Sequence, residues 1–157
     1  MAQTAEQFLE RLVALGYRQG SVEVQARDLI TTVLAEHGVE YYVHLYDTQL
    51  PDYQHVSLTA DGVEVPCLPT GLKSGTVDSN YSLISSLISS QKFIDEPNIN
   101  FNPRCRDAIS QSNFYHAPSW AINVADVQTL AQAEDVQAEL EVEPYTHQAA
   151  NILVGNL

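Results

Sequence analysis

The spacing of the apolar residues changes at Gly38, and this change limits the fold more than any other feature of the sequence. Before Gly38, apolar residues recur every three or four positions, as they do in amphipathic helices. After it, short runs rich in aromatic and β-branched residues are separated by turn residues, as they are in strands. The sequence therefore predicts an α+β fold, with two N-terminal helices followed by a β-rich region that contains short helices.

Capping residues mark the ends of the helices. Thr4 and Gln7 have the spacing of a capping box, which predicts that the first helix begins after Thr4. Ser21 and Asp126 are the expected N-caps of a second and a third helix. Gly38 is the residue type that ends a helix in the left-handed conformation. The expected helices span residues 4–16, 21–38 and 126–133.

Runs of β-branched and aromatic residues predict the strands. The dipeptide Asp61-Gly62 lies between two such runs and predicts a tight hairpin, because it readily adopts the positive φ angles of the turn. Pro66 and Pro69 are expected to end this hairpin. Residues 71–80 are rich in turn residues, and the spacing in residues 81–90 fits a helix and a strand equally. The expected strands span residues 39–46, 56–60, 63–65, 99–101, 118–124, 136–142 and 150–154.

The chain is strongly acidic. Its 157 residues include 7 Lys plus Arg and 20 Asp plus Glu, which gives a formal net charge of −13. A field of this sign repels phosphate groups, so nucleic acid and membrane surfaces are not expected partners. Acidic residues alternate with apolar ones over residues 136–142, which predicts a strand with a solvated acidic face. No signal peptide or membrane span is recognised, so a cytoplasmic location is expected, or an extracytoplasmic one if a leader has been removed.

The two cysteines, Cys67 and Cys105, are expected to be reduced thiols, with a single disulfide as the alternative in an oxidising compartment. Cys105 lies between Arg104 and Arg106, whose positive charges favour a thiolate, and His116 would then be its base. The other interpretation is that Cys105 is a small buried apolar residue.

A second set of polar residues has the donor types of a metal site. His44 and His55 fall on two expected strands, and Asp47 and Asp52 fall in the expected loop between them. The alternative is that these four are surface histidines and loop acids. Residues 71–76 resemble a phosphate-binding loop superficially, but they lack its first glycine and its strand-to-helix context.

The most aromatic stretch is Tyr115-His116-Ala117-Pro118-Ser119-Trp120. Tyr115, His116 and Trp120 are candidates for contact with a partner or substrate, because Tyr and Trp are frequent anchors at interfaces. The alternative is a strand entry that packs into the core. No residue has the spacing of a catalytic or metal-ligating motif, so no catalytic and no metal-binding residue is assigned.

A family resemblance rests on the order of six segments along the chain. These are Tyr17-Arg18-Gln19-Gly20-Ser21, Leu34-Ala35-Glu36-His37-Gly38-Val39, His116-Ala117-Pro118-Ser119-Trp120-Ala121-Ile122-Asn123, residues 126–130, residues 136–143 and Ala150-Asn151-Ile152-Leu153-Val154-Gly155. Together they resemble the N-terminal portion of zinc-dependent exopeptidases of the aminopeptidase and glutamate carboxypeptidase-like group, which carry an inserted protease-associated domain.

The resemblance implies a division of the chain into three parts. Residues 1–48 would be the helical and strand entry of a peptidase-like domain, residues 49–148 a β-rich protease-associated-like domain, and residues 149–157 a return strand toward a missing catalytic domain. In such peptidases the zinc ligands and the catalytic glutamate follow this strand. The resemblance therefore implies that zinc belongs to the missing half of a parent hydrolase, with no cofactor in this chain, and that the partner is a peptide or protein substrate of that parent.

Three functions remain open at this point. The first is the non-catalytic N-terminal portion of a zinc aminopeptidase-like peptidase, with the protease-associated-like region covering the substrate cleft or binding partners. The second is a free-standing protease-associated-like module that binds a protein or peptide and has no enzymatic activity. The third is a small independent enzyme built around Cys105, or around His44 and His55.

Overall fold

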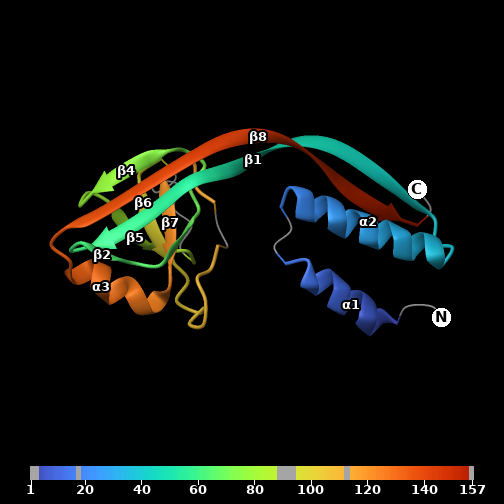
Figure 1. Cartoon of the computed structure of the whole chain (residues 1–157), viewed down its shortest axis with the longest axis horizontal. Coiled ribbons are helices and arrows are strands. Elements are labelled where there is room, and N and C mark those ends of the chain that lie inside the picture. Colours follow the sequence, from blue (N-terminus) through green and yellow to red (C-terminus); the bar gives the residue numbers. More distant parts are fainter. Residues whose placement is uncertain (1–3, 17–18, 88–94, 112–113, 156–157) are drawn as a thin grey trace. The chain divides into compact units, whose positions relative to one another are not determined.

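Three α-helices and two four-stranded sheets form the described part of the chain, and this confirms the α+β class expected from the sequence. The computed structural model describes residues 4–16, 19–87, 95–111 and 114–155 (Figure 1). The chain divides into two units. Unit 1 comprises Met1–Leu50 and Tyr145–Leu157, and unit 2 comprises Pro51–Pro144.

Unit 1 begins with the helix that the capping box predicts, α1 (Ala5–Ala14). The backbone N–H of Gln7 donates to Thr4 Oγ1 at 3.2 Å, and the backbone N–H of Thr4 donates to Gln7 Oε1 at 3.0 Å. These two bonds satisfy backbone donors that the first turn of a helix leaves free. The expectation for the start of this helix is confirmed.

The second helix, α2 (Ser21–Glu36), begins one residue earlier than expected. Its N-cap is Gly20 and not Ser21, which is already helical. Gly20 has φ +58°, a conformation that favours glycine. A Cβ atom at Gly20 would also lie 2.8 Å from the hydroxyl of Tyr145, so tertiary contact and backbone conformation both select glycine here.

Two long strands, β1 (Tyr41–Ala60) and β8 (Val136–Val154), replace the four shorter strands expected in these regions. The breaks expected at residues 47–55 and 143–149 are wrong. The two strands are hydrogen-bonded neighbours, and this pairing keeps polar residues extended although their own preferences do not predict a strand.

The first sheet has the strand order β2-β1-β8-β4, with β2 (Val63–Glu64) and β4 (Gly75–Asp78) at its edges. The expected hairpin is confirmed, because Asp61 and Gly62 have φ +50° and +77° between β1 and β2. The expectation of a turn-rich segment at residues 71–80 is wrong for β4, which pairs antiparallel with β8.

The second sheet has the order β3-β7-β6-β5, formed by β3 (Cys67–Pro69), β7 (Ser119–Ile122), β6 (Asn98–Phe101) and β5 (Ser82–Ser85). β5, β6 and β7 are parallel, and β3 is antiparallel to β7. Pro69 therefore lies within a strand and does not end the hairpin as expected. An edge strand tolerates proline, because the missing backbone N–H can be on the side without a neighbouring strand. Within the ambiguous stretch, residues 82–85 form a strand, and residues 88–90 lie outside the described part.

The expected third helix is present as α3 (Val127–Gln132), preceded by the 3₁₀ turn η2 (Val124–Asp126). Asp126 is its N-cap, but its side chain accepts no capping hydrogen bond. The capping role moves to Asn123, whose Oδ1 accepts from the backbone N–H of Ala125 at 2.9 Å. The 3₁₀ turn shifts the capping site toward the N-terminus.

The core of unit 2 lies between the two sheets. Along β8, residues 136–142 alternate between buried and exposed positions, as the sequence predicts. Trp120 on β7 is fully buried, and its Nε1 donates to the backbone oxygen of Glu139 on β8 at 3.3 Å. The fully buried apolar side chains of this core are Leu58, Ile99, Trp120, Ile122, Leu130 and Leu140.

Candidate functional site

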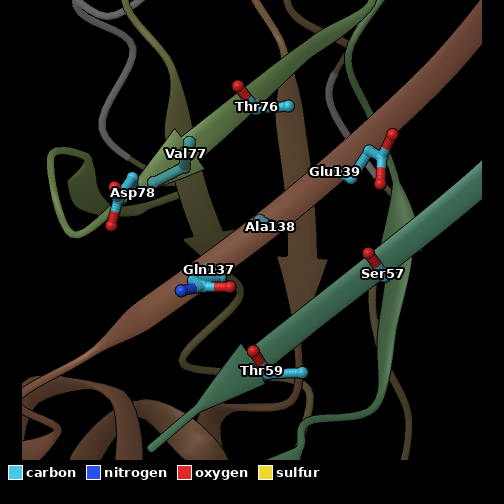
Figure 2. A pocket seen from close by; sticks show the side chains of 8 residues that line it. All are labelled: Ser57, Thr59, Thr76, Val77, Asp78, Gln137, Ala138 and Glu139. Carbon is cyan, nitrogen blue, oxygen red and sulfur yellow. The ribbon is translucent and has the colours of Figure 1, made fainter. Parts of the chain in front are cut away.

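A shallow hollow of about 360 Å³ lies on the outer face of the first sheet, within unit 2. Figure 2 shows that its side chains come from three neighbouring strands, β1, β8 and β4. The lining residues are Ser57, Thr59, Thr76, Val77, Asp78, Gln137, Ala138 and Glu139.

Strand alternation explains the polar character of this hollow. Thr76 pairs with Glu139, and Asp78 pairs with Gln137, so these four side chains stand on the same face of neighbouring strands. The residue between Thr76 and Asp78, Val77, is buried on the opposite face. The apolar residues thus form the core while hydroxyl, amide and carboxylate groups face outward.

The hollow is negatively charged. Glu139, Glu141 and Glu143 are exposed at alternate positions of β8, and the four strands of this sheet contain no Lys or Arg. His55 on β1 lies beside this face, with its Nε2 3.7 Å from Glu139 Oε2. Both side chains are about half exposed, so this pair contributes little to stability. The field of this face favours positively charged groups over anions.

In the part of the chain that the structure describes, no group of three or more His, Cys, Asp or Glu side chains could hold a metal ion. The serine and threonine hydroxyls of the hollow lie beside carboxylates and an amide.

The expected placement of His44 and His55 on two strands, with Asp47 and Asp52 in a loop between them, is wrong, because all four residues lie on the single strand β1. Instead, His44 stacks on Tyr46 with 5.9 Å between ring centroids.

Neither cysteine is in a disulfide. The Cys105 thiol, half-buried, donates to the backbone oxygen of Ala108 at 3.4 Å, and among the described residues no hydrogen bond joins it to His116. Burial, and secondarily the charge of Glu64, raises the pKa of the Cys67 thiol from 9.0 to about 11. Cys67 is therefore a protonated, unreactive thiol at neutral pH.

The aromatic segment places only one of its three candidate contact residues at the surface. Trp120 is 0% and Tyr115 8% exposed, whereas His116 is exposed. Two exposed apolar residues that the sequence did not single out, Leu72 and Phe114, belong to the same region, because Leu72 N donates to the backbone oxygen of Tyr115 at 2.8 Å. Only the tertiary pairing of these two segments indicates that Leu72 lies here.

A buried polar cluster in the second sheet was also missed by sequence reasoning. It consists of Thr70, Asn98, Asn100 and Ser119, all between 0% and 1% exposed. The Ser119 hydroxyl donates to Asn98 Oδ1 at 2.7 Å, and the Asn100 amide donates to the oxygens of Thr70 and Ser119 at 2.9 and 3.0 Å. Because these groups satisfy one another and are closed to solvent, the cluster is structural.

Unit 1 has little core of its own. Of the nineteen buried apolar residues in the described part, only Ala26, Leu29 and Ala149 belong to unit 1. One polar pair anchors α2 to β8, where Glu23 Oε2 lies 3.0 Å from His147 Nε2. Ten of the fifteen exposed large apolar residues belong to unit 1, namely Leu9, Val13, Val39, Tyr41, Tyr42, Leu45, Tyr46, Tyr145, Leu153 and Val154.

Comparison with solved structures identifies similar folds. No protein-family model matches the sequence, and no curated protein matches it. BSAP, a zinc aminopeptidase from Bacillus subtilis, matches with a TM-score of 0.70 at 14% identity, over 98% of this chain and 46% of that chain. A medium-resolution structure of BSAP gives a TM-score of 0.62 at 13% identity, over 94% and 45% of the two chains.

An aminopeptidase from Aneurinibacillus sp. strain AM-1 matches with a TM-score of 0.57 at 12% identity, over 98% of this chain and 48% of that chain. At these identities the similarity is one of fold. The chain spans less than half the length of the aminopeptidases whose fold it shares. Among the described residues, no helix has the length and apolar character that crossing a membrane requires.

Proposed function

We propose that this chain is the non-catalytic N-terminal portion of a zinc aminopeptidase-like peptidase. Residues 1–48 would be the helical and strand entry of the peptidase domain, and residues 149–157 a return strand toward it. Residues 49–148 would be a protease-associated-like accessory domain that covers the substrate cleft or binds partners. The observation that carries the proposal is the uncovered apolar surface of unit 1.

On the β1 strand, this apolar surface includes residues on both faces. Tyr41 and Leu45 lie on one face of the strand and Tyr42 and Tyr46 on the other, and the four are 38–56% exposed. Apolar residues on both faces are typical of a sheet that is covered on both sides by other elements. Exposing so many large apolar side chains is unfavourable for an isolated domain. We infer that further elements of a larger peptidase domain cover them.

The fold comparison supports the same proposal. The similar structures are described as zinc aminopeptidases or an aminopeptidase, and this chain matches less than half of each. In this proposal, zinc and its ligands would belong to the remaining portion of the enzyme. There, a bound zinc ion would supply an activated water for peptide hydrolysis. The partner would be a peptide or protein substrate of the whole enzyme.

The test is to express the complete reading frame that encodes this chain and to assay it beside residues 1–157 alone. A chromogenic aminoacyl anilide serves as the substrate. We expect hydrolysis by the complete protein, loss of at least about tenfold on zinc chelation and recovery when zinc is returned, because removing the metal removes the activated water. Residues 1–157 alone should show no hydrolysis above the uncatalysed rate.

A surface measurement makes the test independent of catalysis. Residues 1–157 should bind an apolar fluorescent dye through unit 1, and Leu9→Glu with Val13→Glu should weaken this binding, whereas Val63→Glu in unit 2 should change it little. The proposal fails if the complete protein hydrolyses no aminoacyl anilide. A reading frame that adds no further domain would favour the free-standing binding module instead.

A further inference from the structure

We propose that the unpaired side of β4 is a docking site for an extended peptide with basic side chains at alternate positions. The strand order β2-β1-β8-β4 makes β4 an edge strand of the first sheet (Figure 1). It pairs with β8 on one side, and among the described residues no strand pairs with its other side. We call that side of residues 75–78 the docking edge. Backbone groups at such an edge bind a further strand through main-chain hydrogen bonds.

Hydrogen bonds at both ends of β4 show which backbone groups of β8 face it. The Ser79 N–H donates to the backbone oxygen of Val136 at 2.7 Å, and the Val136 N–H donates to Ser79 Oγ at 3.0 Å. At the other end, the Val142 N–H donates to Ser74 Oγ at 2.9 Å, and the Ser74 hydroxyl donates to the backbone oxygen of Val142 at 3.1 Å. Because backbone groups alternate in direction along a strand, those of the even-numbered residues of β8 from 136 to 142 point toward β4.

The register of β4 against β8 then gives the direction of each residue of β4. Gly75 and Val77 lie opposite even-numbered residues of β8, so their backbone groups form the hydrogen bonds of this pairing. Thr76 and Asp78 lie opposite odd-numbered residues, so their N–H and C=O groups point away from β8. The docking edge therefore presents the donors and acceptors of two residues at the spacing that an added strand requires.

The inner face of β4 is packed, and this holds the docking edge in an extended conformation. Val77 is only 4% exposed. A Cβ atom at Gly75 would overlap the Pro118 ring, so this ring packs against the backbone of β4. The bonds of Ser74 and Ser79 to β8 fix the two ends of the strand. A strand that is already ordered loses little conformational entropy when it binds a peptide.

The side chains of the docking edge are negatively charged or polar. Thr76 and Asp78 are exposed on the outer face of the sheet, beside Gln137 and Glu139 in the hollow of about 360 Å³ (Figure 2). In a pair of strands, residues opposite each other place their side chains on the same face. A lysine opposite Asp78 would therefore stand beside its carboxylate, with its long side chain directed over β4 toward the hollow.

Charge also selects the occupant among the segments that can pair with a strand edge. A second copy of this chain is unfavourable, because each copy has a formal net charge of −13. Pairing two docking edges would bring the Asp78 residues of both copies into one short ladder, where like charges are destabilising. An acidic peptide is disfavoured for the same reason. A basic extended peptide gains both the backbone hydrogen bonds and the attraction to Asp78.

The test measures the binding of a fluorescently labelled peptide of alternating lysine and valine to residues 1–157 by fluorescence anisotropy at about 0.15 M salt, where distant charges are screened. We expect saturable binding. The same peptide with glutamate in place of lysine should bind at least about tenfold more weakly. A lysine peptide methylated at every backbone nitrogen keeps its charge but has no donor for β4, so it should also bind at least about tenfold more weakly.

Two variants of the chain test the two contributions separately. Asp78→Lys should raise the Kd of the lysine peptide at least about fivefold, because attraction becomes repulsion. Asp107→Lys, an exposed position of unit 2 outside the strands, makes the same change in net charge and should alter the Kd less than about twofold. Thr76→Pro removes a donor of the docking edge and leaves the hydrogen bonds of Gly75 and Val77 to β8, so it should raise the Kd at least about fivefold.

Amide hydrogen exchange locates the bound peptide without any variant. In the free chain, the Val77 amide should exchange at least about tenfold more slowly than the amides of Thr76 and Asp78, because only Val77 donates to β8. A saturating concentration of the lysine peptide should slow exchange at Thr76 and Asp78 at least about tenfold and change Val77 little.

Several results would overturn the proposal. These are no binding of the lysine peptide, equal binding of its methylated form, and unchanged exchange at Thr76 and Asp78 when the peptide is bound. Dimers in light scattering that Asp78→Lys or Thr76→Pro dissociates would identify a second copy as the occupant instead. The docking edge rests on the geometry of unit 2 and not on the proposed peptidase function. None of these measurements uses hydrolysis, so failure of one proposal is distinguishable from failure of the other.

Discussion

Replacing Asn100 by alanine should strongly destabilise unit 2, because its carboxamide connects the buried polar cluster. The Asn100 Nδ2 atom lies 2.9 Å from Thr70 Oγ1, 3.0 Å from Ser119 Oγ and 3.0 Å from the backbone oxygen of Trp120. Its two hydrogens can serve two of these acceptors at a time. Asn100 is only 1% exposed, so in the variant bulk water does not reach the acceptors that lose their donor.

The magnitude follows from the number of groups affected. A buried polar group left without its partner costs about 1–3 kcal/mol, and Asn100→Ala removes two donated hydrogen bonds at once. The expected loss is about 2–4 kcal/mol in the free energy of unfolding. A typical domain has only about 5–15 kcal/mol in total, so the variant should lose a large part of its stability.

The assay is urea unfolding followed by the fluorescence of Trp120, the only tryptophan in the chain. Trp120 lies in unit 2 beside the cluster, so the transition it reports belongs to that unit. Asn80→Ala, at an exposed position, is the matched control and should change the unfolding free energy by less than about 0.5 kcal/mol. Ser119→Ala should cost less in the Asn100→Ala background than alone, because the two residues share a hydrogen bond.

The reasoning would be refuted if Asn100→Ala lost less than about 1 kcal/mol, the net value of a single ordinary hydrogen bond. It would also be refuted if the costs of Asn100→Ala and Ser119→Ala were additive, since groups that satisfy one another cannot be independent.

Three further predictions concern other parts of unit 2. Gly71→Ala should lower the free energy of unfolding by about 1–3 kcal/mol in the same urea assay, because its Cβ would lie 2.4 Å from the backbone nitrogen of Ser119. At pH 8 a thiol reagent should modify Cys67 far more slowly than Cys105. Equal rates of modification at the two thiols would contradict this prediction. The free energy of unfolding should also fall between pH 9 and about 11, because in this range the unfolded chain loses the Cys67 proton whereas the folded chain, with its raised pKa, retains it. Asp61→Ala should lower the midpoint of thermal unfolding and reduce the free energy of unfolding by about 1–2 kcal/mol. The Asp61 carboxylate accepts two backbone N–H bonds at 2.9 and 2.8 Å, and its φ of +50° disfavours alanine. Asp61→Asn keeps an acceptor and tolerates this φ, so it should reduce the free energy of unfolding by less.

Local features of the sequence were sufficient to predict the elements that depend on neighbouring residues. The capping box at Thr4 and Gln7, the Asp61-Gly62 hairpin and the alternation over residues 136–142 are all present in the structure. Each arises from contacts within a few positions along the chain, where spacing and residue type determine the conformation. The α+β class follows from the same local information.

The candidate sites were predicted less well, because they depend on pairing between distant segments. His44 and His55 were expected on two strands joined by a loop, but both lie on the single strand β1. Trp120, a candidate for surface contact, is in the core, since β7 lies inside its sheet and faces β8. The outer hollow was not expected, because it needs β4, and the sequence around β4 is that of a turn.

By itself, the sequence determined where the first helix begins, where the chain reverses at a tight turn and which positions of residues 136–142 face inward. Only the tertiary structure decided that the polar stretches around Pro51 and Pro144 continue as strands, and that Thr70, Asn98, Asn100 and Ser119 meet in a buried cluster. It also decided that few of the described apolar residues of unit 1 are buried. The physical reason is that hydrogen bonding between strands and burial are properties of segments far apart along the chain, and these can override the preference of any single stretch.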